Sequence, residues 1–410
     1  MSKPAGSVPL GEVAPARSRQ QGRRSAVTLA GDTAVVGTAD GDLLGVDVGG
    51  EEMPARRWRH ESDADASVVA AIPFHGGVVV GERSARGAVR FHDADGALRW
   101  QYDTRDDVGA PQSDTRFLLP FVASLATDGK RVYAAARRYE RGQGEEGTTR
   151  EFESVVYAFS SSGEIEWTYR TDASPIALSV RDERLAVAYN RCPGTHQDGL
   201  VVLDSADGTP QWTWDPNTAG QRRVGDVALL DDGVIVTSHG DYCGYRLDQG
   251  GDARWRVPLG TPRERDGEAV YAYPNHVHAS ADGAVFVTGN TYPEDGRETD
   301  ARHPNEHTAT GVSLDGEKRW SSPVGGFASG LGADESLLAV PGAQHFRDRD
   351  AERHGLRVLD VASGHVDTMD TPGIVTAAAV NGETAVAVEE PVVYHDEGIE
   401  YGAYRLRKIQ

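Results

Sequence analysis

The stretch Val201–Trp214 reads VVLDSADGTPQWTW and joins an apolar run to a turn of small and acidic residues, followed by tryptophan. Apolar runs on both sides of a tight turn predict a β-hairpin. Gly208 supplies the positive φ that other residues resist, and aspartates in the turn can bond their own backbone. The stretch therefore predicts two antiparallel strands that meet near Gly208.

The same pattern recurs along the chain, with glycine four residues before tryptophan in the copies that end at Trp100, Trp167, Trp212, Trp255 and Trp320. LLGVDVGG before Trp58 is a stretched copy, Thr368 replaces tryptophan in a weaker copy, and a truncated copy lies at Ala403–Leu406. Successive copies are 42, 67, 45, 43, 65 and 48 residues apart. A period of about 45 residues with four short strand signals per unit predicts the blades of a β-propeller.

Eight apolar runs that begin such units predict an all-β chain, a single eight-bladed β-propeller of four-stranded antiparallel blades over residues 25–410. The last copy stops after its third strand. Residues 1–24 are therefore expected to complete the closing blade, with Ser7–Val13 as its outer strand. The repeated tryptophan is expected to fill the wedge between neighbouring blades.

The repeat of aspartate, small residues, glycine, three variable residues and tryptophan resembles that of pyrroloquinoline-quinone-like (BamB-like) β-propellers, from about Ser25 to Arg407. This family includes quinoprotein dehydrogenases and a cofactor-free outer-membrane assembly factor, and the resemblance implies the fold. The dehydrogenases have an adjacent cysteine pair and a calcium site, whereas this chain has two separate cysteines, Cys192 and Cys243. We expect no cofactor, with pyrroloquinoline quinone or a divalent metal as the alternatives.

The charge is strongly negative: 63 acidic and 42 basic residues give −21, and only four of the basic residues are lysines. Such a surface resembles that of halophilic proteins, whose carboxylates keep them hydrated in salt. No secretory signal or long apolar run is present, so we expect a cytoplasmic protein with no membrane span. A field of this sign argues against nucleic-acid binding by the whole surface.

A small basic cluster near the N-terminus stands out from this acidic background, with arginines at positions 17, 19, 23 and 24. Two interpretations are open for it. Either the cluster binds nucleic acid or anionic lipid, or its arginines form ion pairs with the acidic body of the protein.

Long links are expected on one face of the propeller, because the links into the inner strand and between the second and third strands share that face. They are Gln101–Leu119, Arg137–Glu153, Asn190–Gly199, Leu259–Asn275, Asn290–Thr308 and Gly342–Gly355. A chain that only had to fold would keep such links short. This face is therefore the expected place for a ligand or partner, unless the links are simply solvated.

The candidate residues on this face lie in two neighbouring repeats. His276 and His278 are expected at the start of an inner strand and on one side of it, with Tyr271 and Tyr273 above them. One repeat earlier, SHGDYC contains His239 and Asp241.

Three interpretations of these residues are open. Histidines with a carboxylate can bind a transition metal, which would use His239, Asp241, His276 and His278. The site can instead hold a small polar ligand, or the histidines can simply bond backbone and water.

No nucleophile elbow, zinc-binding HExxH or P-loop motif is present, and GQGEEG at 142–147 places two glutamates where a phosphate would have to bind. We therefore expect no catalytic activity. The sequence favours a monomeric protein-binding or scaffold module. The alternative is a ligand binder at the central channel or a quinone-dependent dehydrogenase-like enzyme.

Overall fold

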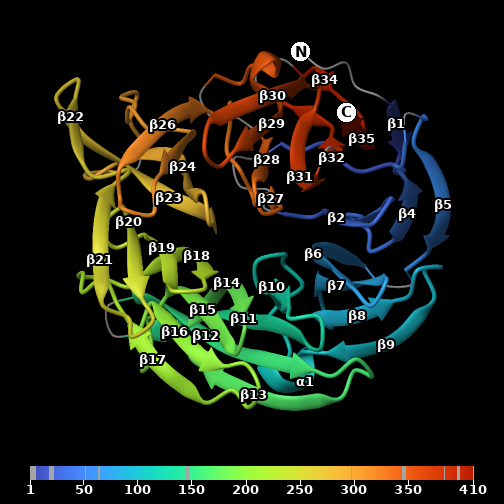
Figure 1. The fold of residues 1–410 in the computed structure, drawn as a ribbon, viewed down its shortest axis with the longest axis horizontal. Helices are drawn as coiled ribbons and strands as arrows, with labels where there is room; N and C mark the ends of the chain where they lie inside the picture. Colours follow the sequence, from blue (N-terminus) through green and yellow to red (C-terminus); the bar gives the residue numbers. More distant parts are fainter. Residues whose placement is uncertain are drawn as a thin grey trace.

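The computed structural model describes residues 6–17, 23–50, 52–62, 65–144, 147–296, 298–343, 348–382, 384–394 and 398–409. Antiparallel sheets follow one another in chain order around a ring, and each four-stranded sheet has one edge strand near the centre (Figure 1). The chain is a β-propeller, as the sequence predicts.

The first sheets of the ring cover the N-terminal third of the chain. One sheet contains β2 (Ala26–Ala30), β3 (Thr33–Gly37), β4 (Leu43–Asp47) and β5 (Ala55–His60). The next has eight strands, β6 (Ala66–Phe74), β7 (Gly77–Ser84), β8 (Ala88–His92), β9 (Leu98–Asp103), β10 (Phe121–Thr127), β11 (Val132–Gly144), β12 (Gly147–Phe159) and β13 (Ile165–Thr171). A short helix, α1 (Arg105–Val108), lies between β9 and β10.

Two four-stranded sheets follow. They contain β14 (Ser174–Arg181), β15 (Arg184–Arg191), β16 (Leu200–Asp204) and β17 (Pro210–Trp214), and then β18 (Val224–Leu230), β19 (Gly233–Ser238), β20 (Cys243–Asp248) and β21 (Ala253–Pro258). A five-stranded sheet comes next, with β22 (Arg263–Arg265), β23 (Glu268–Ser280), β24 (Gly283–Pro293), β25 (Thr308–Val312) and β26 (Lys318–Pro323).

The last sheets complete the ring. One contains β27 (Gly332–Ala333), β28 (Leu337–Gly342), β29 (Gly355–Asp360) and β30 (Gly364–Asp370), with a 3₁₀ helix at Ala351–Arg353. The closing sheet contains β31 (Ile374–Asn381), β32 (Thr384–Glu390), β35 (Arg405–Ile409) and β1 (Gly6–Pro9), and β33 (Val392–Val393) pairs with β34 (Glu400–Tyr401). Eight blades stay a prediction, because one pair, Phe121 with Arg83, joins two expected units into the eight-stranded sheet.

Burial explains which residues form which strand. The second strand of a sheet is covered on both sides, and all six residues of β19, GVIVTS, are buried. Outer strands are covered on one side only, so β21, ARWRVP, alternates exposed residues with the half-buried Trp255. Continuous apolar runs thus mark second strands, and alternation marks outer ones.

Tryptophan locks six pairs of successive repeats together. The ring of Trp167 lies over Gly208 of the following sheet, where an added Cβ would be 2.6 Å from the ring. Its Nε1 donates a hydrogen bond to the carbonyl oxygen of Ser205, 3.1 Å away. The same packing joins Trp58 to Gly96, Trp100 to Gly163, Trp212 to Gly251, Trp255 to Gly316 and Trp320 to Gly364. The expected role of tryptophan between blades is confirmed.

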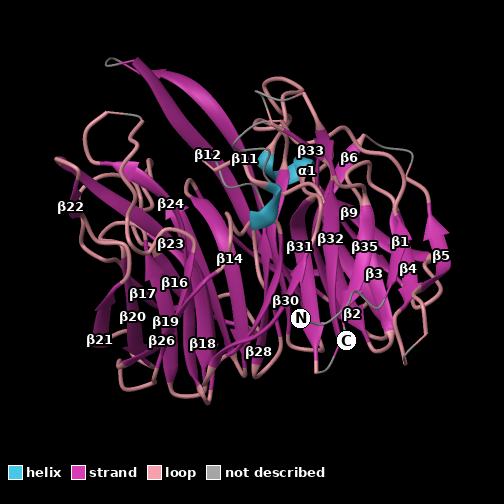
Figure 2. Cartoon of the chain, turned by 90° about the horizontal axis from the view of Figure 1, so that it is seen from above, coloured by secondary structure: helices cyan, strands magenta, loops and turns pink. Residues whose placement is uncertain are grey.

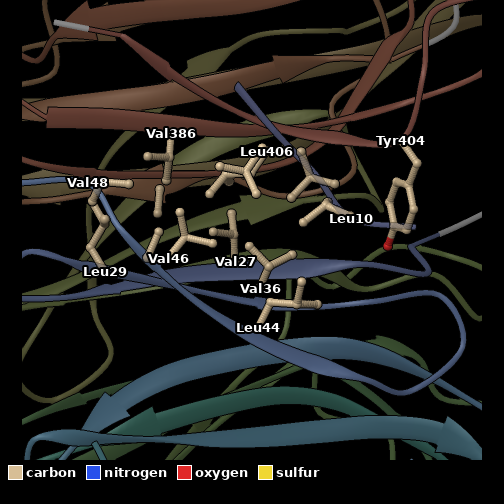
Figure 3. Packing of buried hydrophobic residues seen from close by; sticks show 14 residues of the cluster. Leu10, Val27, Leu29, Val36, Leu44, Val46, Val48, Val386, Tyr404 and Leu406 are labelled. Carbon is tan, nitrogen blue, oxygen red and sulfur yellow. The ribbon is translucent and has the colours of Figure 1, made fainter. Parts of the chain in front are cut away.

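The N-terminal segment closes the ring. β1 pairs antiparallel with β35, from Gly6 opposite Lys408 to Pro9 opposite Arg405, and so forms the outer strand of the closing sheet. Leu10 is 2% exposed and packs among apolar residues of this sheet and of β2, β3 and β4 (Figure 3). Chain ends that are far apart in sequence thus share one core.

The long links lie on one face, because antiparallel pairing brings the second-to-third links and the links between sheets to the same edge. Figure 2 shows α1, β33 and the projecting β11–β12 hairpin at this edge, which we call the long-link face. Strands extend into some of the expected links, most of all in 137–153, where β11 and β12 stay paired as far as Gly144 and Gly147. Within the described ranges, no helix has the length and apolar character needed to cross a membrane.

Candidate functional site

Four tyrosines gather on the long-link face and form what we call the tyrosine cluster: Tyr242, Tyr271, Tyr273 and Tyr292. The rings of Tyr242 and Tyr271 have centroids 4.5 Å apart, and those of Tyr271 and Tyr292 are stacked at 5.9 Å. The hydroxyl oxygens of Tyr271 and Tyr273 are 3.4 Å apart. The structure thus brings the two predicted tyrosines together and adds two that the sequence reasoning missed.

The length of β23 explains why this cluster forms. β23 begins at Glu268, because β22 and the end of β24 extend its pairing, and Tyr271 lies directly opposite Tyr292. The register shifts on both sides of Pro274, so the residues before Pro274 and those after it pair with β24 in different registers. His276 and His278 therefore lie inside β23 rather than at its start, which corrects the expected position.

Tyr242, Tyr271 and Tyr273 stay protonated at neutral pH. Burial, together with the neighbouring Tyr273 and Glu294, raises the pKa of Tyr242 to about 12. Burial also raises the pKa of Tyr271 and of Tyr273. The cluster therefore offers neutral hydroxyl groups and aromatic faces.

His239 lies behind the cluster, directly after β19. Its ring is 4.8 Å from that of Tyr273, and its Nδ1 is 3.3 Å from the amide nitrogen of Asn190. Burial, with Arg222 and His276 nearby, lowers the pKa of His239 to about 3. The imidazole is therefore neutral at physiological pH.

His276 contacts two neighbouring sheets. Its Nε2 is 3.0 Å from the carbonyl oxygen of Ala328, and its Nδ1 is 3.5 Å from Oδ2 of Asp226 in β18. The same carboxylate oxygen accepts a hydrogen bond from the backbone N–H of Val277, 3.0 Å away. These contacts link β18, β23 and the segment before β27.

The other two predicted residues lie apart from this group. Asp241 accepts hydrogen bonds from Tyr245 and from Arg256, so its carboxylate is engaged within its own sheet. His278 lies beside the β27–β28 turn at Asp334 and Glu335, and burial lowers its pKa. Among the residues that the structure describes, no three histidine, cysteine or carboxylate side chains form a group that could hold a metal ion.

Arginines near the tyrosine cluster were missed by the sequence reasoning. The guanidinium of Arg222 lies 4.4 Å from the centroid of the Tyr273 ring, and Arg222 forms an isolated backbone bridge with Arg191. A signal was present in the sequence: the second-strand runs GVVVGER, RVYAAAR and RLAVAYNR each end in arginine.

The arginines of the N-terminal basic cluster have different kinds of partner in the structure. Nε of Arg24 is 2.6 Å from Oε2 of the buried Glu390, which agrees with pairing to the acidic body. Arg23 instead reaches across the ring and donates to the carbonyl oxygens of Val69 (3.1 Å) and Ser329 (2.7 Å). Arg19 lies outside the described residues.

The residues do not match what quinone binding by a dehydrogenase of this fold family needs. Cys192 and Cys243 are both buried and belong to different core clusters, so they are not an adjacent pair. Burial raises the pKa of each thiol to about 12. No step through a quinone is therefore derived for this chain.

Solved structures with the same fold were found at low sequence identity. A europium-containing methanol dehydrogenase has a TM-score of 0.61 and 10% identity, with 95% of this chain and 85% of that chain covered. The C-terminal WD40 domain of Sif2 has a TM-score of 0.56 and 11% identity, covering 100% and 98%. The Dos1 propeller has a TM-score of 0.56 and 13% identity, covering 99% and 94%. At these identities the likeness shows the β-propeller fold alone.

Sequence comparison identifies the family. No curated protein gives a significant match to this chain. A family model described as outer membrane protein assembly factor BamB matches residues 148–366, which is just over half of the chain. This range contains four of the repeats with glycine four residues before tryptophan. The chain therefore belongs to the BamB family of pyrroloquinoline-quinone-like β-propellers.

Proposed function

We propose that this protein is a non-catalytic scaffold that binds a protein partner through its long-link face. The observation that carries the proposal is the contrast between the two faces. The long-link face has unrepeated elements, namely α1, β22, the β33–β34 pair and the projecting β11–β12 hairpin. Short turns such as Ala30–Thr33 connect the first and second strands at the other edge. Unrepeated surface on a repeated scaffold is where specificity is built.

An exposed aromatic residue marks this face. Phe117 lies in the link between β9 and β10, and 64% of it is exposed. An aromatic ring of this kind suits the apolar centre of an interface, and the net charge of −21 favours partners with basic patches. We further propose that the protein works as a monomer in a salt-rich cytoplasm.

Affinity capture in molar salt tests the proposal when point variants are compared. Phe117→Asp should release a partner that the wild type retains. Val366→Asp is the matched control, because Val366 is 54% exposed on the outer strand β30 and should leave capture unchanged. Equal retention by both variants, or no reproducible partner at all, would contradict binding through this face.

The enzyme alternative is tested separately. Pyrroloquinoline quinone and calcium are added to the purified protein, and the absorbance spectrum is recorded after gel filtration. A retained quinone spectrum together with dye-linked alcohol oxidation would replace the scaffold proposal by a dehydrogenase-like function.

A further inference from the structure

Three successive repeats place an arginine at the same corner of the ring. Arg83 lies opposite Ser67, Arg137 lies opposite Phe121, and Arg191 lies opposite Ser174. In each pair the inner-strand residue is the first or second residue of its strand, so the three arginines lie at the same corner of successive units. The long-link face begins at this corner.

Contacts join these arginines, with Arg222, in two pairs. The guanidinium carbons of Arg83 and Arg137 lie 4.1 and 5.2 Å from the centroid of the same Phe121 ring. Arg191 is bridged to Arg222, whose guanidinium lies over Tyr273. We call Arg83, Arg137, Arg191 and Arg222 the arginine arc. All four residues are half-buried, so the arc borders solvent and is walled by aromatic rings.

No carboxylate in the described part of the chain lies within ion-pair distance of an arc residue, although the chain has 63 acidic residues. The adjacent arginines differ in this respect. Arg138, next to Arg137, pairs with Glu140, and Arg223, next to Arg222, pairs with Asp215 at 2.8 Å. The arc thus places arginines without an ion pair directly beside arginines that have one.

The arc residues repel one another. Burial, together with Arg116, Arg137 and Arg23, lowers the pKa of Arg83 to about 9. Burial and Arg191 lower the pKa of Arg137 to about 10. Burial, followed by Arg222, lowers the pKa of Arg191 to about 10. These three arginines still carry positive charge at pH 7, so like charges are held together without a counter-charge from the described part of the chain.

Partly desolvated like charges without a partner destabilise a fold, and such arrangements are typical of functional sites. Nε of Arg137 is buried and has no hydrogen-bond partner in the described residues, so donors remain for a ligand. Arginine binds carboxylate and phosphate groups with two parallel hydrogen bonds.

We propose that the arginine arc binds a small multivalent oxyanion, with carboxylate or phosphate groups, beside the tyrosine cluster. Four guanidinium groups call for more than one negative group on the ligand. The ligand is small because it has to fit among half-buried side chains between the rings of Phe121 and Tyr273. The hydroxyl groups of the tyrosine cluster would bond polar groups at its other end.

Isothermal titration calorimetry with citrate and with pyrophosphate, at an ionic strength held constant with sodium chloride, tests this site. We expect saturable binding of at least one of them, which also identifies the source as carboxylate or phosphate. Arg137→Gln and Arg191→Gln should each weaken that binding at least tenfold. Arg99→Gln is the control, because Arg99 is exposed on β9 and pairs with Asp93 far from the arc.

A second measurement separates an anion site from a structural role. Removing one uncompensated charge should raise the melting temperature of the ligand-free Arg137→Gln variant, whereas loss of a structural arginine would lower it. Absence of wild-type binding to both anions, equal binding by Arg137→Gln and Arg99→Gln, or binding of an aspartate-rich peptide alone would overturn the proposal. A lowered melting temperature of ligand-free Arg137→Gln would overturn it too.

Discussion

The ring of Trp167 covers Gly208 in the following sheet, and its indole N–H is hydrogen-bonded to the carbonyl oxygen of Ser205, three residues before that glycine. Gly208 has a φ of 75° and no space for a side chain. Glycine is therefore favoured here both by the backbone conformation and by the packing of the Trp167 ring. Because the relationship repeats around the ring, the turn of one sheet positions the outer strand of its neighbour.

Gly208→Ala is expected to lower the free energy of unfolding by about 3 kcal/mol, since backbone strain and a clash with Trp167 act together. Gly220→Ala is the matched control, because Gly220 has a φ of 88° but no atom within 4 Å of an added Cβ. The control should cost only about 1 kcal/mol through strain. Denaturant unfolding gives both values, and equal losses would show that the tryptophan contact is unimportant.

The hydrogen bond of the tryptophans can be separated from their packing. Nε1 of Trp320 donates to the carbonyl oxygen of Val361 at 3.1 Å, whereas Nε1 of Trp212 has no partner in the described residues. Trp320→Phe should therefore destabilise the fold by about 1 kcal/mol more than Trp212→Phe. Thermal unfolding of the two variants measures the difference, and the reverse order would refute this assignment.

Removal of residues 1–15 is expected to lower the melting temperature markedly, because β1 is lost from the edge of β35 and Leu10 from the core. Leu10→Ala alone should cost about 3 kcal/mol. Glu12→Ala, at an exposed position of the same segment, should change little. An unchanged melting temperature of the truncated protein would show that the closing sheet is stable without β1.

Arg24 and Glu390 form a buried ion pair where the ring closes, and breaking it should lower the free energy of unfolding. Glu390 accepts hydrogen bonds from Arg24, Ser25 and Thr376, all buried. Glu390→Leu should destabilise the fold by about 3 kcal/mol or more, since it leaves the charge of Arg24 buried and unpaired. The double variant Glu390→Leu with Arg24→Met should recover much of that loss in chemical unfolding. A double variant as unstable as the single one would mean that packing, not charge, dominates.

His239 should make stability depend on pH. Its folded pKa of about 3 lies below the ordinary histidine value of about 6.5. The unfolded chain therefore binds a proton that the folded chain lacks between these values, so stability is full above about pH 6.5 and falls as the pH drops toward 3. Across this window, the melting temperature of His239→Gln should change less with pH than that of the wild type. The exposed His365→Gln should behave as wild type; an unaltered pH slope in His239→Gln would contradict the assignment.

Local sequence signals were enough for most of the fold. Glycine at positive φ, tryptophan four residues later and continuous apolar second strands all act within one repeat or between adjacent ones. The same signals indicated the outer strand at the N-terminus, since the last copy lacks one. The unpredicted extension of β11 and β12 has a physical reason: REFES and RRYER are polar apart from one aromatic residue each, in a hairpin that leaves the ring, so no apolar run marks it.

The site was predicted only in part. Tyr271 and Tyr273 do lie together, because side chains two apart on a strand share a side. Asp241 was grouped with the histidines from its place in the chain, but its carboxylate turns to Arg256. Tyr292, Arg191 and Arg222 come from three other segments, and their meeting depends on how the sheets follow one another around the ring.

The sequence by itself determined the repeat, the strand order within each unit and the contacts that lock neighbouring units, because each depends on residues close in the chain. Only the tertiary structure decided that Arg83, Arg137, Arg191 and Arg222 lie together without acidic partners. Closing the ring brings the same corner of successive repeats to one centre, so Arg83, Arg137 and Arg191, each 54 residues from the next in sequence, come near one another there.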